Sequence, residues 1–239
     1  MGAAIKIIVT FVAALAFACA AHAHANESLV DTLVDRLEGS LSSCSPVDAS
    51  QAQRAVIEAD IAQFIQAVPA AATARFEVHD CPLMDGFVLK GQTIVLSSRL
   101  ARLPYGQRFF IMAHEYGHYR LQHRNRLSGF VSSITAGRGD ASAAQAALEQ
   151  NAAGVTAMSY RAEFEADAFA VLTMDTAGID PEDGARLFDS LGRGRDNATH
   201  PAFHRRASAI RTLHARLQQS EPQAVRPSAA AASAVEDGR

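Results

Sequence analysis

The chain has 239 residues, of which 49% are hydrophobic and 20% are charged. This composition suits one globular domain with a buried core, with or without tails. The formal net charge of -3 excludes the strongly basic balance of nucleic-acid-binding proteins, so no nucleic acid partner is expected.

The first 25 residues have the three parts of a secretory signal peptide. Lys6 precedes an apolar run at 7–21, and Ala23 and Ala25 offer small residues at a cleavage site. The apolar run is shorter than the ~20 residues that a membrane-spanning helix needs. We therefore expect residues 1–25 to be a signal peptide, with an uncleaved anchor as the alternative. The mature chain is expected to be periplasmic or secreted and to have no transmembrane span.

The mature chain keeps two cysteines, Cys44 and Cys81. In an oxidising compartment such a pair suggests one disulfide, which would join the N-terminal helical segment to the start of the core. Two unpaired thiols are the alternative, because the sequence alone does not show the geometry of the pair.

Two helices are predicted over residues 28–67, before any recognised motif. Ser28 can cap the first helix, whose apolar face stops at Gly39. The second helix follows Pro46 and carries apolar residues at helical spacing.

The periodicity then changes from helical to alternating. Residues 75–80 and 86–98 alternate and are rich in β-forming residues, and Lys90-Gly91 lies where a tight hairpin turn is expected. The chain is predicted to be helical after this point, with helices at about 106–124, 159–177, 180–191 and 201–217. Residues 140–155 are expected to form an alanine-rich helix or a long surface excursion. The predicted fold class is α+β, mostly helical, with a small antiparallel sheet before the histidine-rich helix.

These elements define one domain with a tail. Residues 27–217 are the expected domain, and residues 218–239 are low in complexity and predicted to be disordered. The alanine-rich segment 140–157 is a candidate lid over a cleft.

The stretch "AHEYGHYRLQH" (113–123) contains the pattern H-E-x-x-H. On a helix, His114 and His118 lie on one face with Cβ atoms roughly 5–6 Å apart, so both imidazoles can reach one zinc ion. Glu115 is rotated aside, where it can hold a water on that ion rather than bind the ion itself. The pattern also occurs by chance on solvated helices, so it requires a third ligand.

The stretch "RAEFEADAF" (161–169) supplies that ligand. Glu163 and Asp167 share a helix face, whereas Glu165 lies about 200° from Glu163 and is expected to be a solvated or helix-pairing charge. Glu163 is therefore the predicted ligand, and Asp167 can accept a hydrogen bond from a ligand histidine. Two histidines and a glutamate with an open fourth position indicate one catalytic Zn²⁺ per chain, not a structural site.

Four stretches together resemble a known family: "HEYGH" (114–118), "EFEAD" (163–167), "AGIDP" (177–181) and "THPAFHRRASAI" (199–210). They are similar to the zinc metallopeptidase family of the CAAX prenyl protease and the heat-shock protease HtpX, a gluzincin family with HExxH and ExxxD motifs. The similarity is to its soluble, exported bacterial branch. It covers about residues 75–215, the expected catalytic core, in a zincin-like metalloprotease domain.

The resemblance implies roles for further residues. It implies His114, His118 and Glu163 as zinc ligands, Glu115 as general base and Asp167 behind a ligand. His200 is implied near the cleft, where it could steady the oxyanion, with an ordinary loop histidine as the alternative.

The resemblance also implies features around the site. It suggests that Arg206 pairs with an acid near the ligands, and that residues 91–98 form an edge strand that pairs with an extended substrate. The absence of spanning helices argues against prenylated or membrane-embedded substrates.

The remaining histidines and tyrosines near the motif are assigned no chemistry. His123 is expected to point away from the ligand face, and His79, His204 and His214 are expected at the surface. Tyr116 and Tyr119 are expected to pack the helix.

The expected function is a zinc-dependent endopeptidase acting on polypeptides, in particular unfolded or damaged cell-envelope proteins, with an envelope protein partner as an option. The first alternative is an envelope chaperone or binding module with latent or minor protease activity. The second is a zinc hydrolase of another bond. An intact Glu115 argues against a purely structural protein, because a scaffold needs no base there.

Overall fold

The computed structural model describes residues 30, 32–34, 44, 51–81, 86–89, 93–138 and 140–220. The signal segment 1–25, the Lys90-Gly91 turn and residues 221–239 lie outside the described residues. Among the helices within these ranges, none combines the length and the apolar character that crossing a bilayer requires.

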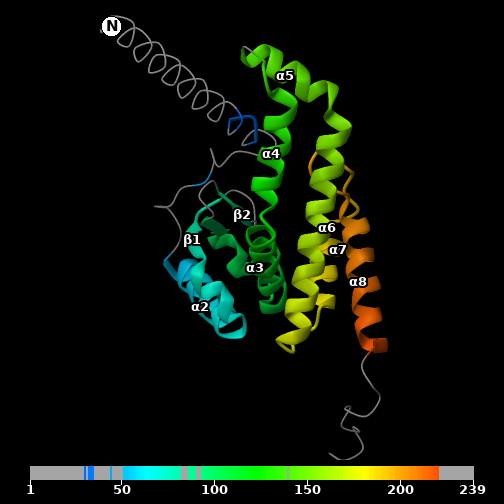
Figure 1. The fold of residues 1–239 in the computed structure, drawn as a ribbon. Coiled ribbons are helices and arrows are strands. Elements are labelled where there is room, and N and C mark those ends of the chain that lie inside the picture. The colour runs from blue at the N-terminus through cyan, green and yellow to red at the C-terminus, as the bar shows by residue number, and fades with distance from the viewer. Residues whose placement is uncertain are drawn as a thin grey trace, which may run out of the picture.

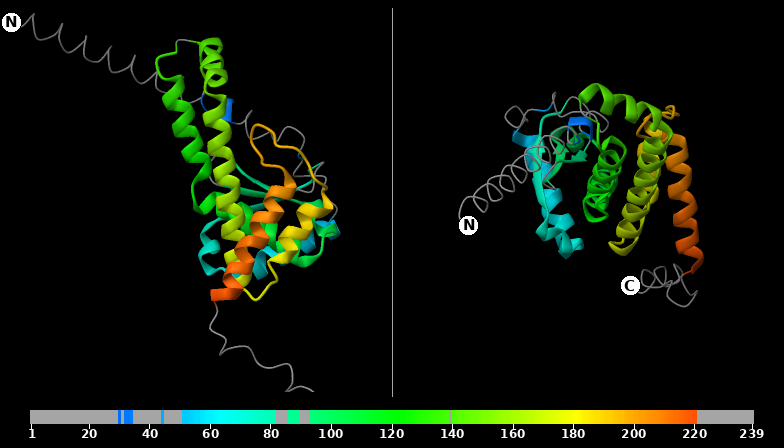
Figure 2. Two further views of the ribbon diagram at one scale, coloured as in Figure 1. Left: turned by 90° about the vertical axis from the view of Figure 1, so that its right-hand side faces the viewer. Right: turned by 45° about the horizontal axis from the view of Figure 1, so that its top comes forward.

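The protein is α+β and mostly helical, as the sequence predicts. The elements in chain order are α2 (Gln51–Ala67), the short 3-10 helix η2 (Pro69–Thr73), β1 (Arg75–His79), β2 (Gly86–Val88), β3 (Thr93–Ser97), the 3-10 helix η3 (Ser98–Arg102), α3 (Tyr105–Arg120), α4 (His123–Thr135), α5 (Ala141–Gln150), α6 (Ala152–Thr176), α7 (Glu182–Ser190) and α8 (Phe203–Ser220). The sheet and α2 lie on one side of helix α3, and α6 lies on its other side (Figures 1 and 2). Helix α8 covers the outer side of α6.

The small sheet is mixed, not antiparallel as predicted. Its order is β1-β3-β2, with β1 parallel to β3 and β2 antiparallel to β3. The chain leaves β1, forms the outer strand β2 and returns as the middle strand β3. The prediction that residues 91–98 form an edge strand was therefore wrong, and the outer strand beside the histidine helix is β2.

Aromatic side chains join α2 to the histidine helix. The ring of Phe64 lies 5.2 Å from that of Phe109 and 5.7 Å from that of Tyr116, in edge-to-face arrangements. Such pairs add about 0.5–1.5 kcal/mol each beyond the burial of their area. Tyr116 is buried, so its predicted packing role is confirmed. These contacts pack α2 against α3, the helix that carries the H-E-x-x-H pattern.

The predicted helix over 106–124 is interrupted. Helix α3 ends at Arg120, and Gln122 has a left-handed backbone with φ of 57° before α4 begins at His123. A left-handed residue is costly for any side chain except glycine and redirects the helix axis. The change of direction alters the position of His123 relative to the candidate site.

Helix α4 continues into a helical extension with α5 and the first part of α6. Asp140 caps α5 by accepting a hydrogen bond from the backbone N–H of Ala143 at 2.8 Å. The extension has a small core of its own, which includes three residues near the N-terminus, at positions 30, 33 and 34. Figure 1 shows α4 and α6 side by side with α5 at their end. The lid role of 140–157 stays a prediction.

A disulfide joins Cys44 to Cys81, as predicted. Cys81 is buried and lies two residues after the end of β1. The residue between them, Asp80, accepts a hydrogen bond from Arg99 through its carboxylate. The bridge ties the N-terminal region to the sheet.

Candidate metal centre

Helices α3 and α6 approach closely at the point where they carry the candidate ligands. A Cβ atom on Gly117 would lie 3.2 Å from the Cβ of Phe169 and 3.3 Å from the Cα of Ala166. The small residues at 117 and 166 thus let the two backbones pack together. This packing places "HEYGH" opposite Glu163 and Asp167.

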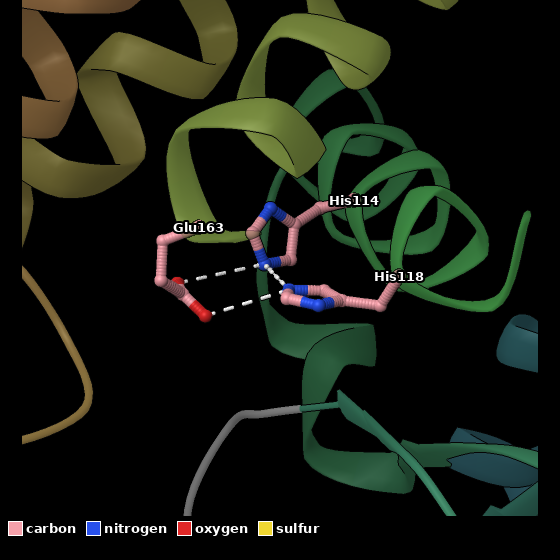
Figure 3. Close-up of side chains that lie close together, drawn as sticks. All are labelled: His114, His118 and Glu163. Carbon is pink, nitrogen blue, oxygen red and sulfur yellow. Dashed lines mark hydrogen bonds and ion pairs between the residues drawn. The ribbon is translucent and has the colours of Figure 1, made fainter. Parts of the chain in front are cut away.

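Three side chains from the two helices point toward one another, as Figure 3 shows. The Nε2 atoms of His114 and His118 are 3.0 Å apart. The Oε1 atom of Glu163 is 3.4 Å from His118 Nε2, and its Oε2 atom is 3.8 Å from His114 Nε2. Tetrahedral ligands at zinc distances of about 2.0–2.2 Å lie about 3.3 Å from one another. The three donors therefore have the spacing of a metal site.

The chemistry of the donor set also fits a cation. Glu163 is buried, and its Oε2 atom has no aligned hydrogen bond although Arg206 Nη1 lies 2.6 Å away as an ion pair. Two imidazole nitrogens facing each other at 3.0 Å need either a proton or a cation between them. Two imidazoles and a carboxylate with a further open position are the ligands of a catalytic zinc ion.

Charges around Glu163 keep it ionised. Burial would raise the pKa of the Glu163 carboxyl, but Arg206, the hydrogen bond with His118 and the two imidazoles hold that pKa well below its usual value. The Glu163 carboxylate is therefore available to a cation over the whole neutral range.

Asp167 and Arg206 hold His114 from behind. The Oδ1 atom of Asp167 is 3.0 Å from His114 Nδ1. Arg206 donates to Asp167 through Nε at 2.8 Å and through Nη2 at 2.6 Å, and its guanidinium lies over the Phe188 ring. A proton on Nδ1 of His114 leaves Nε2 free to bind a metal. The expected pairing of Arg206 with an acid is confirmed, and it involves both Asp167 and Glu163.

His118 is held by His123, which the sequence did not indicate. The two Nδ1 atoms are 2.9 Å apart, and His123 Nε2 lies 3.1 Å from Glu165 Oε2. Burial and the neighbouring His118 lower the pKa of His123 to about 4, against the opposing effect of Glu165. The prediction that His123 points away from the ligands was wrong. On an unbroken helix it would lie about 140° from His118, and only the break at Gln122 brings it back.

Glu165 is the partner of α4, not merely a solvated charge. It accepts from Arg126 Nη1 at 2.7 Å as well as facing His123. Of the two predicted roles for Glu165, a solvated charge or a charge that pairs with a helix, the structure has the second. The signal that could have indicated it is the presence of Arg126 and His123 on the helix after the motif.

Glu115 lies beneath the outer strand of the sheet. It is buried, and a Cβ atom on Gly86 of β2 would lie 2.7 Å from its Cγ atom. A side chain at position 86 would therefore displace the carboxyl group. Glycine at this position allows β2 to pass directly over Glu115.

His200 lies at the margin of the three donors. Its Nε2 atom is 3.7 Å from Glu163 Oε1, and its Nδ1 atom is 2.8 Å from Thr199 Oγ1. The backbone N–H of His200 donates to Asn197 Oδ1, and Tyr160 donates to the Asn197 carbonyl oxygen. The loop thus holds His200 near the site, and its chemical role stays a prediction.

The other histidines among the described residues lie elsewhere. His204 is exposed, as expected, whereas His79 and His214 are half-buried. His79 pairs with Glu77 at 3.0 Å on β1. None of the three is part of the group of donors that could hold a metal.

Comparison with known proteins identifies a family. The model of peptidase family M48 matches residues 50–214, from the start of α2 into α8. The search of the curated proteins gave no significant match.

Proposed function

The chain belongs to peptidase family M48, and we propose that it is a zinc-dependent endopeptidase that hydrolyses peptide bonds of polypeptide substrates. The family supports a metallopeptidase. The observation that carries the proposal is the group of three facing donors from His114, His118 and Glu163. Its spacing and its chemistry suit one zinc ion per chain.

In this proposal the two histidines bind through Nε2 and Glu163 through its carboxylate. Bound zinc would lower the pKa of a water molecule and polarise the scissile carbonyl group. Asp167 and Arg206 keep His114 in the tautomer that the ligand role needs, because Asp167 accepts the Nδ1 proton and Arg206 keeps Asp167 ionised.

Glu115 is the proposed general base. It would accept the proton of the attacking water and return it to the leaving amine. Its position next to the ligand histidine and beneath Gly86 supports this role. His200, at the margin of the donors, would steady the oxyanion by donating a hydrogen bond from Nε2.

The proposal extends to the setting of the enzyme. Residues 27–217 would form the metallopeptidase domain, with N-terminal helices at 28–67 and the catalytic core at 75–215, between a signal peptide (1–25) and a tail (218–239). The Cys44–Cys81 disulfide is compatible with an oxidising compartment, which supports a periplasmic or secreted location. Unfolded or damaged envelope proteins are the proposed substrates.

Metal removal and return test the proposal. We expect dialysis against a chelator to abolish casein cleavage, and one equivalent of Zn²⁺ to restore it. The variant His114→Ala should lose both zinc and cleavage, whereas His204→Ala, an exposed histidine away from the donors, should keep both. Full cleavage by the metal-free protein would refute the proposal.

A further inference from the structure

A second histidine supports the candidate metal centre from outside the H-E-x-x-H pattern. His123 Nδ1 lies 2.9 Å from His118 Nδ1, on the side of the ring away from Glu163. His123 Nε2 lies 3.1 Å from Glu165 Oε2. The side chain of His123 is only 4% exposed, so water does not replace these partners.

The ligand role of His118 fixes the direction of each hydrogen bond in the series from His118 through His123 to Glu165. If His118 binds through Nε2, its remaining proton is on Nδ1, and it must donate to His123 Nδ1. His123 then accepts on Nδ1 and carries its own proton on Nε2. That proton points at Glu165, a carboxylate that also accepts from Arg126 Nη1 at 2.7 Å. In this arrangement both nitrogens of the His123 ring have a partner, whereas moving its proton to Nδ1 would place two N–H donors face to face and leave Nε2 as an acceptor facing a carboxylate.

The local backbone is built so that this contact occurs. Gln122 adopts a left-handed conformation with φ of 57° between α3 and α4. Such a conformation in a residue other than glycine is costly. It turns His123 back toward His118 instead of away from it.

We propose that His123 is a positioning residue that fixes the tautomer and the ring orientation of His118, with Glu165 and Arg126 holding His123 in turn. This inference rests on the proposed function, because it assigns His118 a metal-binding role. It adds a residue that the motif does not contain, together with its hydrogen-bond direction.

The first test observes the zinc-loaded wild-type chain directly. In nitrogen NMR spectra of protein with ¹⁵N-labelled histidine, we expect His118 as the Nδ1–H tautomer and His123 as the Nε2–H tautomer. Variants at 118 and 123 assign the signals. A His123 ring with its proton on Nδ1, or with two protons, would overturn the proposal.

The second test measures zinc affinity by competition with a chromogenic chelator. His123→Phe keeps the ring volume but removes the acceptor, and we expect zinc binding to weaken about 10-fold or more. His123→Asn places Oδ1 where Nδ1 was and should restore affinity to within about threefold of wild type. A purely structural role for the ring would give the opposite order, because asparagine fills less of the space.

A matched control and a surface variant complete the set. His79→Phe replaces another histidine that pairs with a glutamate, on β1, and should leave zinc affinity unchanged. Glu165→Gln, at a half-exposed side chain, keeps the fold intact and should weaken zinc binding by about threefold. Wild-type affinity in both His123→Phe and Glu165→Gln would overturn the positioning role alone. Failure of the wild-type chain itself to bind zinc would instead overturn the proposed function, and this inference with it.

Discussion

The two histidines of the candidate metal centre are held from opposite sides by different chemistry. His114 faces Asp167, a carboxylate whose side chain is 3% exposed and which is fixed by Arg206. His118 faces the neutral ring of His123, and the charge behind that ring, Glu165, is 36% exposed. Both arrangements offer an acceptor to Nδ1. The difference shows that fixing a tautomer needs an acceptor, whereas a buried charge also needs a compensating partner.

The free energy of unfolding should therefore depend more on Arg206, the cation on the buried His114 side, than on Arg126, the cation on the His118 side. Arg206→Met leaves Glu163 and Asp167 together without their guanidinium, and we expect it to lower the free energy of unfolding of the zinc-free protein by about 3–5 kcal/mol. Urea denaturation measures this change. Added zinc should reduce the difference, because the ion supplies a new partner for Glu163. A loss below about 1 kcal/mol would show that the two sides are energetically alike.

The next effect concerns the acceptor behind His114. Asp167→Asn keeps the size of the side chain but replaces the charged acceptor with an amide, and we expect zinc affinity to fall about 10- to 100-fold. Chelator competition measures this fall beside Glu165→Gln, the same change at the carboxylate on the other side, which lies behind the His123 ring. Equal losses in the two variants would contradict the asymmetry.

The smallest loss of stability is expected on removal of Arg126, the exposed cation. Arg126→Met removes a partner that is itself 42% exposed and pairs with the half-exposed Glu165. Surface pairs of this kind contribute about 0–1 kcal/mol to the free energy of unfolding. The same urea measurement as for Arg206→Met gives a direct comparison. A loss as large as that of Arg206→Met would show that the His123 side depends on charge after all.

The part of the site that the sequence predicts follows from helical periodicity. Residues four apart share a face, so helical spacing alone groups His114 with His118, and Glu163 with Asp167. The same face argument separates Glu163 from Glu165. These groupings depend only on residues near one another in the chain.

The part that the sequence does not predict depends on backbone geometry and on distant contacts. The residue types at 121–123 do not indicate a left-handed Gln122, so helical periodicity predicts that His123 points away from the face that carries His118. The antiparallel pairing expected within 86–98 is present between β2 and β3, but β1 pairs parallel with β3, because alternation identifies a strand and not its neighbours. The position of Gly86 over Glu115 follows from the order of the strands and could not be read from the sequence.

The central claim is tested most directly by casein cleavage with wild-type protein beside Glu115→Gln, with bound zinc measured in both. We expect both proteins to hold about one zinc ion and the variant to lose cleavage by about 10²-fold or more. Wild-type cleavage by Glu115→Gln would contradict the role of this carboxylate. The absence of cleavage by both proteins, each with zinc bound, would contradict the endopeptidase assignment and favour a binding module.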